Sequence, residues 1–375
     1  MGNWWSPSIV VLDGGVVVVT ALGKSATSIA HSTPTFMQAF RSTDHGRTFR
    51  PPTTLLPEDG RVYVGGSLAY SASTHHLNFV WTHVNNSGCT PACGVGNLSR
   101  LVSSDEGASW TDAGQLRGAD GRRIISDGQV NSGLKKRHAP FEGRLVLTRE
   151  LSFGAERPVF PTPRGFKNTA GVVYSDDDGA QWSAGAPMPP PFSEGEAAVA
   201  ELSNGSLVIS ARNGQNRSDH RSCAHEPCRV FARSDDGGAS WGHMWHVPYD
   251  ALPAGDCEAA MAHAELPGHA IGALIIGFNM NTTTDDRTNY TLHTSLDGGE
   301  TWQWASGVYP FWAGYSALGV LGPAQRVGER SWRVDVGAAF QLGHNLGSHV
   351  ETGGADLGWA RRALEISVEN GEKKD

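Results

Sequence analysis

The stretch Ser103-Ser104-Asp105-Glu106-Gly107-Ala108-Ser109-Trp110 is one of five near-copies of a single eight-residue motif in this 375-residue chain. The other copies begin at Ser42, Ser175, Ser234 and Ser295, so successive copies start 61, 72, 59 and 61 residues apart. A regular period longer than about 20 residues is typical of solenoids and propellers. The motif is therefore the strongest indication of the architecture.

The residues of the motif predict a turn between two strands. The aspartate at its third position can accept hydrogen bonds from backbone N–H groups a few residues on. The glycine two residues later suits a positive φ, and the final aromatic residue can pack between neighbouring sheets. A β-prone run precedes each copy, such as Gly171–Tyr174. We expect each copy to join two strands of a repeated sheet.

Length and composition agree with a closed all-β fold. The chain has 47 glycines and 20 prolines, yet 39% of its residues are hydrophobic and 12 are tryptophan, which argues against a disordered chain. We predict one six-bladed β-propeller over residues 1–370, with blades of four antiparallel strands, and a disordered tail over 371–375. Pairing of a strand at 9–12 or 16–20 with the strand near 364–368 would close the ring and protect its edges. A two-domain β-sandwich is the alternative.

The charge distribution disfavours two classes of partner. The formal net charge is -8 and no long run has one sign, which argues against nucleic acid or an anionic membrane as the main partner. No apolar run approaches the roughly 20 residues of a membrane span. A small anionic ligand stays compatible with these features, because local arginines can outweigh a negative total.

The cysteines and glycosylation triplets indicate an oxidising compartment. Two close pairs, Cys89 with Cys93 and Cys223 with Cys228, are predicted disulfides, and Cys257 is left over. A zinc site is the alternative for the second pair. Six Asn-x-Ser/Thr triplets, which are acceptors for N-glycosylation, indicate a glycoprotein. Together with the cysteine pairs they indicate the secretory-pathway lumen, a lysosome or the extracellular space. The first residues lack the basic segment of a secretory signal, so we expect the recorded start to be truncated. The triplets are at Asn85, Asn97, Asn204, Asn216, Asn281 and Asn289.

The motif S-x-D-x-G-x-S/T-W is the Asp box (BNR repeat), and five copies at this period resemble a sialidase (neuraminidase). The cysteine pairs and the triplet at Asn289 are most similar to the lysosomal-type sialidases of animals. This resemblance covers essentially the whole chain and implies that the boxes lie on the rim, away from a central pocket. It also implies an exo-α-sialidase that acts on sialylated glycans, glycoproteins or gangliosides and needs neither metal nor cofactor.

The chemistry of sialic acid defines the residues that such an enzyme needs. Arginines hold the carboxylate of the sugar, preferably in bidentate pairs. Sialidases use a tyrosine as nucleophile, and a neighbouring carboxylate must take its proton because a phenol of pKa about 10 is a weak nucleophile. An acid protonates the leaving oxygen.

Three segments resemble the catalytic segments of the family. Around E-L-S-N-G-S, Glu196 matches the base and Arg212 matches one carboxylate-binding arginine, with Glu194 and Glu201 as alternatives for the base. The strand–turn–strand pattern of this segment should return both of its ends to one edge of a sheet.

The other two segments supply the second arginine and the nucleophile. Arg287, ahead of the fifth Asp box, matches the second carboxylate-binding arginine. Tyr315, in G-Y-S-A-L, matches the nucleophile of a retaining mechanism, and Tyr309 is the alternative.

The N-terminal part departs from the family pattern. No arginine occurs in Trp4–Val10, where the family has Arg-Ile-Pro, and Lys24 and His31 stand near the places of a further arginine and the acid aspartate. Gln341 replaces a glutamate that supports the missing arginine, which avoids a buried unpaired charge. The sequence therefore predicts either an active enzyme assisted by Lys24 and by His31 or water, or a catalytically impaired propeller that binds acidic glycans.

Overall fold

The computed structural model describes residues 3–24, 35–71, 73–84, 96–126, 129–152, 168–189, 195–212, 229–248, 250–254, 257–280, 287–343 and 355–368. Every regular element in these ranges is a β-strand, and none of these residues forms a helix that could cross a membrane. Several predictions fall outside the described residues: the tail 371–375, His31, Cys89, Cys93, Cys223 and Cys228.

Four antiparallel sheets each contain four strands that are neighbours in the sheet order. The first sheet comprises β1 (Asn3–Val11), β2 (Val17–Lys24), β3 (Phe36–Ser42) and β4 (Thr53–Leu56). The second comprises β5 (Val62–Ser71), β6 (His76–Val84), β8 (Ser99–Ser103) and β9 (Thr111–Gln115). The third comprises β11 (Gly133–Lys135), β12 (Leu145–Ser152), β13 (Asn168–Ser175) and β14 (Ser183–Ala184). The fourth comprises β15 (Ala197–Glu201), β16 (Leu207–Arg212), β17 (Arg229–Ser234) and β18 (Met244–His246). A short pair is formed by β7 (Gly96–Asn97) and β10 (Ile125–Ser126).

The remaining strands form one seven-stranded sheet. It comprises β19 (Ala260–Ala264), β20 (Ala273–Asn279), β21 (Thr288–Ser295), β22 (Gln303–Val320), β23 (Gln325–Arg326), β24 (Ser331–Gly343) and β25 (Ala355–Ser367). The 18-residue β22 pairs with β21 through residues 303–312 and with β24 through residues 313–320. The predicted all-β, propeller-like arrangement is confirmed, whereas six separate blades are not seen, because β22 joins the last two groups of strands.

The Asp boxes form the turns that their sequence predicts. In the second sheet, Ser103 Oγ donates to Asp105 Oδ1 over 2.8 Å, and the N–H groups of Gly107 and Ser109 donate to Ser103 Oγ and Asp105 Oδ1, also over 2.8 Å. Gly107 has a φ of 86°, in the region that favours glycine. The box thus ties the end of β8 to the start of β9.

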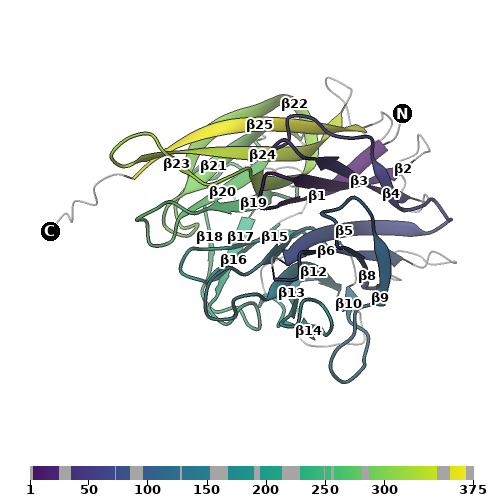
Figure 1. Ribbon diagram of the computed structural model, residues 1–375. Coiled ribbons are helices and arrows are strands. Elements are labelled where there is room, and N and C mark those ends of the chain that lie inside the picture. Colours follow the sequence, from purple (N-terminus) through teal and green to yellow (C-terminus); the bar gives the residue numbers. More distant parts are fainter. Residues whose placement is uncertain are drawn as a thin grey trace, which may run out of the picture.

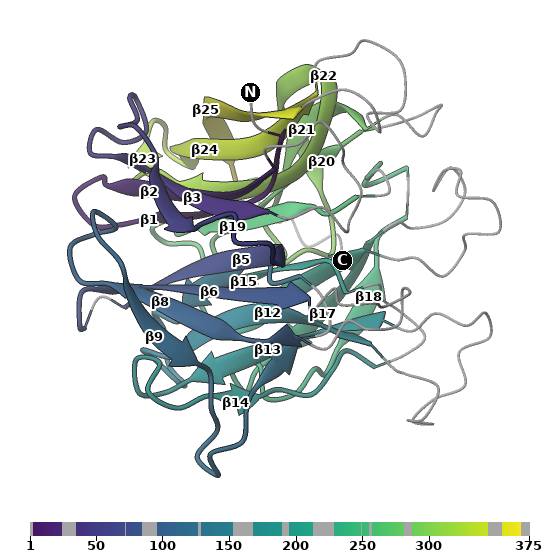
Figure 2. The ribbon, with the colours of Figure 1, turned by 90° about the vertical axis from the view of Figure 1, so that its right-hand side faces the viewer.

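The boxes also pack each sheet on its neighbour. A Cβ on Gly107 would lie 2.9 Å from a methyl group of Val18 in β2, and one on Gly46 would lie 2.5 Å from the ring of Trp359 in β25. The indole N–H of Trp359 donates to Gly46 O over 2.8 Å. Figures 1 and 2 both show the first sheet beside β24 and β25.

Among the described residues, the ring therefore closes by side-chain packing, and the strand pairing that we predicted is not present. β1 pairs with β2, and β25 pairs with β24. Val17 and Val19 of the first sheet share a buried apolar cluster with Leu321 and Ala339 of the last. Apolar packing of this kind contributes in proportion to the area removed from water.

The boxes and the predicted site residues lie at opposite ends of the strands. In the fourth sheet, β15 begins directly after Glu196, β16 ends at Arg212, and β17 ends at the box residue Ser234. Because antiparallel strands alternate in direction, Glu196 and Arg212 lie at the same end of the sheet's strands, and the box lies at the opposite end. This placement agrees with a structural role for the boxes.

Candidate active site

The β15–β16 hairpin brings Glu196 and Arg212 together. Ser206 N donates to Asn204 Oδ1 over 3.1 Å, and Gly205 adopts a φ of 86° in the tight turn. The register pairs Ala197 with Ala211, so the next residues outward also face each other. Arg212 N donates to Glu196 O over 2.9 Å, and Arg212 Nη1 donates to Glu196 Oε2 over 2.9 Å. The predicted return of both strand ends to one edge is confirmed.

Tyr315 reaches the same carboxylate from another sheet. It lies in β22 at the irregularity between Ala313 and Ser316, where the strand passes from β21 to β24. Its Oη donates to Glu196 Oε1 over 2.7 Å. Glu196 therefore holds Arg212 with one carboxylate oxygen and the Tyr315 phenol with the other.

Arg287 completes the group of four residues that the sequence selects. Its Cζ lies 5.6 Å from the centroid of the Tyr315 ring, within the range of a cation–π contact. Ala313 N donates to Arg287 O over 2.7 Å, which fixes the start of β21 beside β22. The structure thus brings Glu196, Arg212, Arg287 and Tyr315 into one site.

The electrostatics of the site keep a proton on Tyr315 and a charge on Glu196. Burial and the Glu196 carboxylate raise the pKa of Tyr315 well above its ordinary value. Burial alone would raise the pKa of Glu196, but Arg212, the hydrogen bond from Tyr315 and Arg287 together hold that pKa below its ordinary value. A phenol in this state becomes nucleophilic only as its proton passes to the adjacent carboxylate.

Gln129 belongs to the site and was not selected from the sequence. Its Nε2 donates to Tyr315 Oη over 3.3 Å. Its Oε1 accepts from Asn131 Nδ2 over 2.8 Å and from Ser6 Oγ over 3.0 Å. Gln129 and Asn131 precede β11 in the third sheet, and no local motif marks them, because only the closed ring brings this segment to β22.

Glu258 is a second acidic residue that the sequence did not indicate. It is 2% exposed, and its Oε2 has no hydrogen-bond partner among the described residues. Burial and the Glu196 carboxylate raise the pKa of Glu258 well above its ordinary value. The preceding Cys257 is a free, buried thiol whose pKa burial raises to about 11. The Cys257 thiol is therefore neutral near pH 7, and burial favours the protonated form of Glu258.

Lys24 lies at the end of β2 in the first sheet. Its Nζ is 4.1 Å from the centroid of the Trp5 ring, and its side chain is buried. Burial lowers its pKa to about 8. Its binding of the sugar carboxylate stays a prediction.

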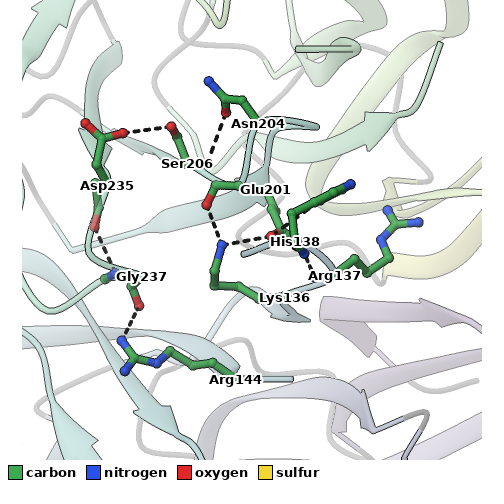
Figure 3. A network of polar contacts seen from close by, with 12 residues as sticks. Lys136, Arg137, His138, Arg144, Glu201, Asn204, Ser206, Asp235 and Gly237 are labelled. Atoms are coloured by element: carbon green, nitrogen blue, oxygen red, sulfur yellow. Dashed lines mark hydrogen bonds and ion pairs between the residues drawn. The ribbon is translucent and has the colours of Figure 1, made fainter. Parts of the chain in front are cut away.

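The alternatives weighed from the sequence lie elsewhere in the structure. Glu201 ends β15 at the box edge, where it accepts from Lys136 Nζ over 2.8 Å and from the N–H groups of Arg137 and His138 (Figure 3). Tyr309 is partly buried and packs against the apolar core, with its ring 5.6 Å from that of Phe340. Neither alternative pairs with the other catalytic candidates, and Glu194 is outside the described residues.

Comparisons with known proteins agree with this fold. A family model described as a BNR repeat-like domain matches residues 65–306. The chain is 23% identical over 344 residues to a sialidase of Micromonospora viridifaciens, which covers 85% of this chain and 48% of that protein. It is 30% identical over 284 residues to a sialidase of Bacteroides fragilis, which covers 70% of this chain and 47% of that protein. The chain thus spans about half the length of these curated relatives.

A solved structure shows the same fold. The structure of a Hadza microbial sialidase superposes with a TM-score of 0.69 at 18% identity, over 96% of this chain and 66% of the other. The two sequence relatives named above are bacterial and not animal proteins. The comparisons therefore support the predicted relationship to sialidases, without its assignment to the lysosomal animal type.

Proposed function

Because this chain belongs to the BNR repeat-like domain family, whose model matches residues 65–306, we propose that it is an exo-α-sialidase. The proposed reaction is the hydrolysis of terminal sialic acids from glycans, glycoproteins or gangliosides, with retention of configuration. The similarity to bacterial sialidases supports this substrate class.

The observation that carries the proposal is the 2.7 Å hydrogen bond from Tyr315 Oη to Glu196 Oε1. In the proposed first step, Glu196 takes the phenol proton as Tyr315 Oη bonds to the anomeric carbon and the bond from that carbon to the aglycone oxygen breaks. Water then replaces the enzyme at that carbon, and Glu196 returns the proton to Tyr315. Two displacements at one centre give net retention.

Two arginines suit the carboxylate of the substrate. Arg212 and Arg287 are held beside Tyr315, and their guanidinium groups match a carboxylate in geometry and charge. We propose that Lys24 assists them and that His31 or water protonates the leaving oxygen. The raised pKa of Glu258 favours its protonated form, which leaves more positive charge in the site for an anionic ligand.

A second candidate is a propeller that binds acidic glycans without cleaving them. It is favoured by the first strand, because β1 contains no arginine in Asn3–Val11. It is also favoured by Gln341, which stands where the family has a glutamate. The Gln341 side chain is 8% exposed and lies so close to Gly314 that its Oε1 would be 2.1 Å from a Cβ at that position. Loss of one bidentate contact to a carboxylate would weaken binding by a few kcal/mol, since each hydrogen bond to charge contributes roughly 1.5–3 kcal/mol.

We further propose that the seven-stranded sheet represents two blades joined through β22, which would give six blades in one domain over 1–370. The change of partner within β22, from β21 to β24, supports this division. The relationship to the lysosomal animal type and a lumenal, lysosomal or extracellular location also remain proposals from the sequence.

The test is turnover of a fluorogenic sialoside between pH 4 and 7. We expect wild-type protein to hydrolyse it, Tyr315→Phe to lose most of kcat/KM, and the matched control Tyr309→Phe to retain it. NMR of the first product should show the α-anomer of sialic acid. Absence of Tyr315-dependent turnover would refute the enzyme proposal, and retention of sialoside on immobilised protein would then select the binding alternative.

A further inference from the structure

The Tyr315 oxygen has a second partner besides Glu196. Gln129 Nε2 donates to Tyr315 Oη over 3.3 Å, while Tyr315 Oη donates to Glu196 Oε1 over 2.7 Å. A phenol oxygen can donate one hydrogen bond and also accept. In this arrangement the donor function is used by Glu196 and one acceptor position by Gln129. We propose that Gln129 is a catalytic hydrogen-bond donor to the nucleophile, an inference that rests on the proposed sialidase function.

The Gln129 amide is oriented by its other contacts. Its Oε1 accepts from Asn131 Nδ2 over 2.8 Å and from Ser6 Oγ over 3.0 Å. Its backbone N–H donates to Glu150 Oε2 over 3.1 Å. With Asn131 Nδ2 and Ser6 Oγ donating to its oxygen, the amide presents its NH₂ group to Tyr315.

The two residues that hold the amide oxygen are themselves buried. Asn131 is 6% exposed and Ser6 is 4% exposed. Ser6 lies at the β-bulge between Trp5 and Ser8 with a φ of 44°. A non-glycine residue seldom adopts this left-handed conformation, and such residues gather at functional sites. The first and third sheets therefore both contribute to placing the Gln129 NH₂ group beside Tyr315 in the last sheet.

The donor acts on the charge that Tyr315 Oη gains and loses. In the first step, Oη passes its proton to Glu196 and bonds to the anomeric carbon, the bond to the aglycone breaks, and the departing oxygen takes a proton from water. In the second step, water attacks the anomeric carbon, and the electron pair of the Oη–carbon bond returns to Oη. Oη then recovers its proton from Glu196, and the proton of the attacking water neutralises the hydroxide left by the first step.

A preorganised N–H group stabilises the partial negative charge on Oη in both transition states. The effect should be largest when Oη departs, because the phenolate is then the leaving group. A substrate with a good leaving group makes that second step rate-limiting. Gln129 should therefore matter most for kcat with an aryl sialoside.

The experiment compares wild-type protein with Gln129→Met, which removes the donor and keeps the length of the side chain. With an aryl sialoside, we expect kcat to fall about 10- to 100-fold, as for loss of one hydrogen bond to a developing charge. A pre-steady-state burst should appear or grow, because the glycosyl-enzyme accumulates. Ser6→Ala should give a smaller loss, since Asn131 still holds the amide oxygen. The exposed Gln325→Met is the matched control for this substitution.

A second readout does not depend on turnover. In protein labelled with ¹³C at the tyrosine Cζ, Gln129→Met should shift the Tyr315 resonance and leave the other six of the seven tyrosines in place. Wild-type kcat in the variant would overturn the proposal. A loss of kcat with an unmoved Tyr315 resonance would also overturn it, because Gln129 would then act through the fold. If wild-type protein turns over no sialoside, the sialidase function fails, and the resonance alone decides whether Gln129 contacts the phenol.

Discussion

The buried ion pair between Lys136 and Glu201 should be a large local determinant of stability. Lys136 is 0% exposed, Glu201 is 5% exposed at its side chain, and the two charged atoms are 2.8 Å apart (Figure 3). Glu201 ends β15, the strand that begins next to Glu196, and Lys136 follows β11 in the neighbouring sheet. The pair therefore joins two sheets at the strand ends opposite the candidate active site.

Replacing Lys136 by Met should destabilise the fold strongly. The carboxylate of Glu201 would remain buried without its lysine partner. The N–H groups of Arg137 and His138 would still donate to it over 2.6 and 3.1 Å, and His138 Nδ1 would still lie 3.5 Å from Glu201 Oε1. The Lys136 Nζ also donates to Gly205 O, which would lose this donor. Removing one partner of a buried pair costs about 3–5 kcal/mol, because the other charge is left uncompensated.

Urea unfolding followed by tryptophan fluorescence measures this change. The matched control is Lys135→Met, whose partly exposed Nζ donates to Ser73 Oγ over 3.0 Å, a hydrogen bond with a net contribution of about 0.5–1.5 kcal/mol. The double variant Lys136→Met/Glu201→Gln should recover part of the loss, and the cycle gives the coupling energy. Equal unfolding free energies for Lys136→Met and Lys135→Met would refute the reasoning.

Three further predictions follow from single residues. Asp105→Ala should lower the free energy of unfolding by about 1–3 kcal/mol, because the hydrogen bonds to Ser103 and Ser109 are lost. The folded variant should keep its kcat/KM, and a selective loss of activity would contradict the structural role of the box. Burial lowers the folded-state pKa of Lys24 from 10.5 to about 8, so the unfolded chain binds more protons between these values and stability should rise from pH 8 to 10.5; Lys24→Met should remove that rise in pH-dependent unfolding curves. Because the folded-state pKa of Glu258 is raised, stability should fall as pH rises from about 4.5 through that pKa. Glu258→Gln should remove this fall in the same unfolding measurement and keep kcat/KM within about threefold at pH 5. A tenfold loss of kcat/KM would show that the ionised form is needed.

The period of the Asp boxes was sufficient to predict an all-β propeller. Each box carries its own turn chemistry, in which Asp105 and Gly107 act within one short segment, so the local sequence specifies the local structure. The mode of closure was not predictable in this way. It depends on contacts such as Trp359 with Gly46, which are 313 residues apart and belong to no periodic pattern.

Only some residues of the candidate site could be predicted from the sequence. Glu196 and Arg212 lie on one hairpin whose turn is visible in the sequence, and Tyr315 and Arg287 lie in segments that resemble those of a known family. Gln129 could not be identified in this way, because its partners belong to the first and last sheets. Polar residues that act between sheets have no sequence spacing by which to recognise them.

The most direct test of the account is the identity of the residue that bonds to the sugar. A sialosyl fluoride with a second fluorine next to the anomeric carbon should slow breakdown of the glycosyl-enzyme and allow it to be trapped. Peptide mass spectrometry should then find one added sialosyl group on Tyr315, and none in Glu196→Gln or Tyr315→Phe over the same time. A sialosyl group on a different residue, or turnover without any trapped enzyme, would contradict the assignment of Tyr315 as nucleophile.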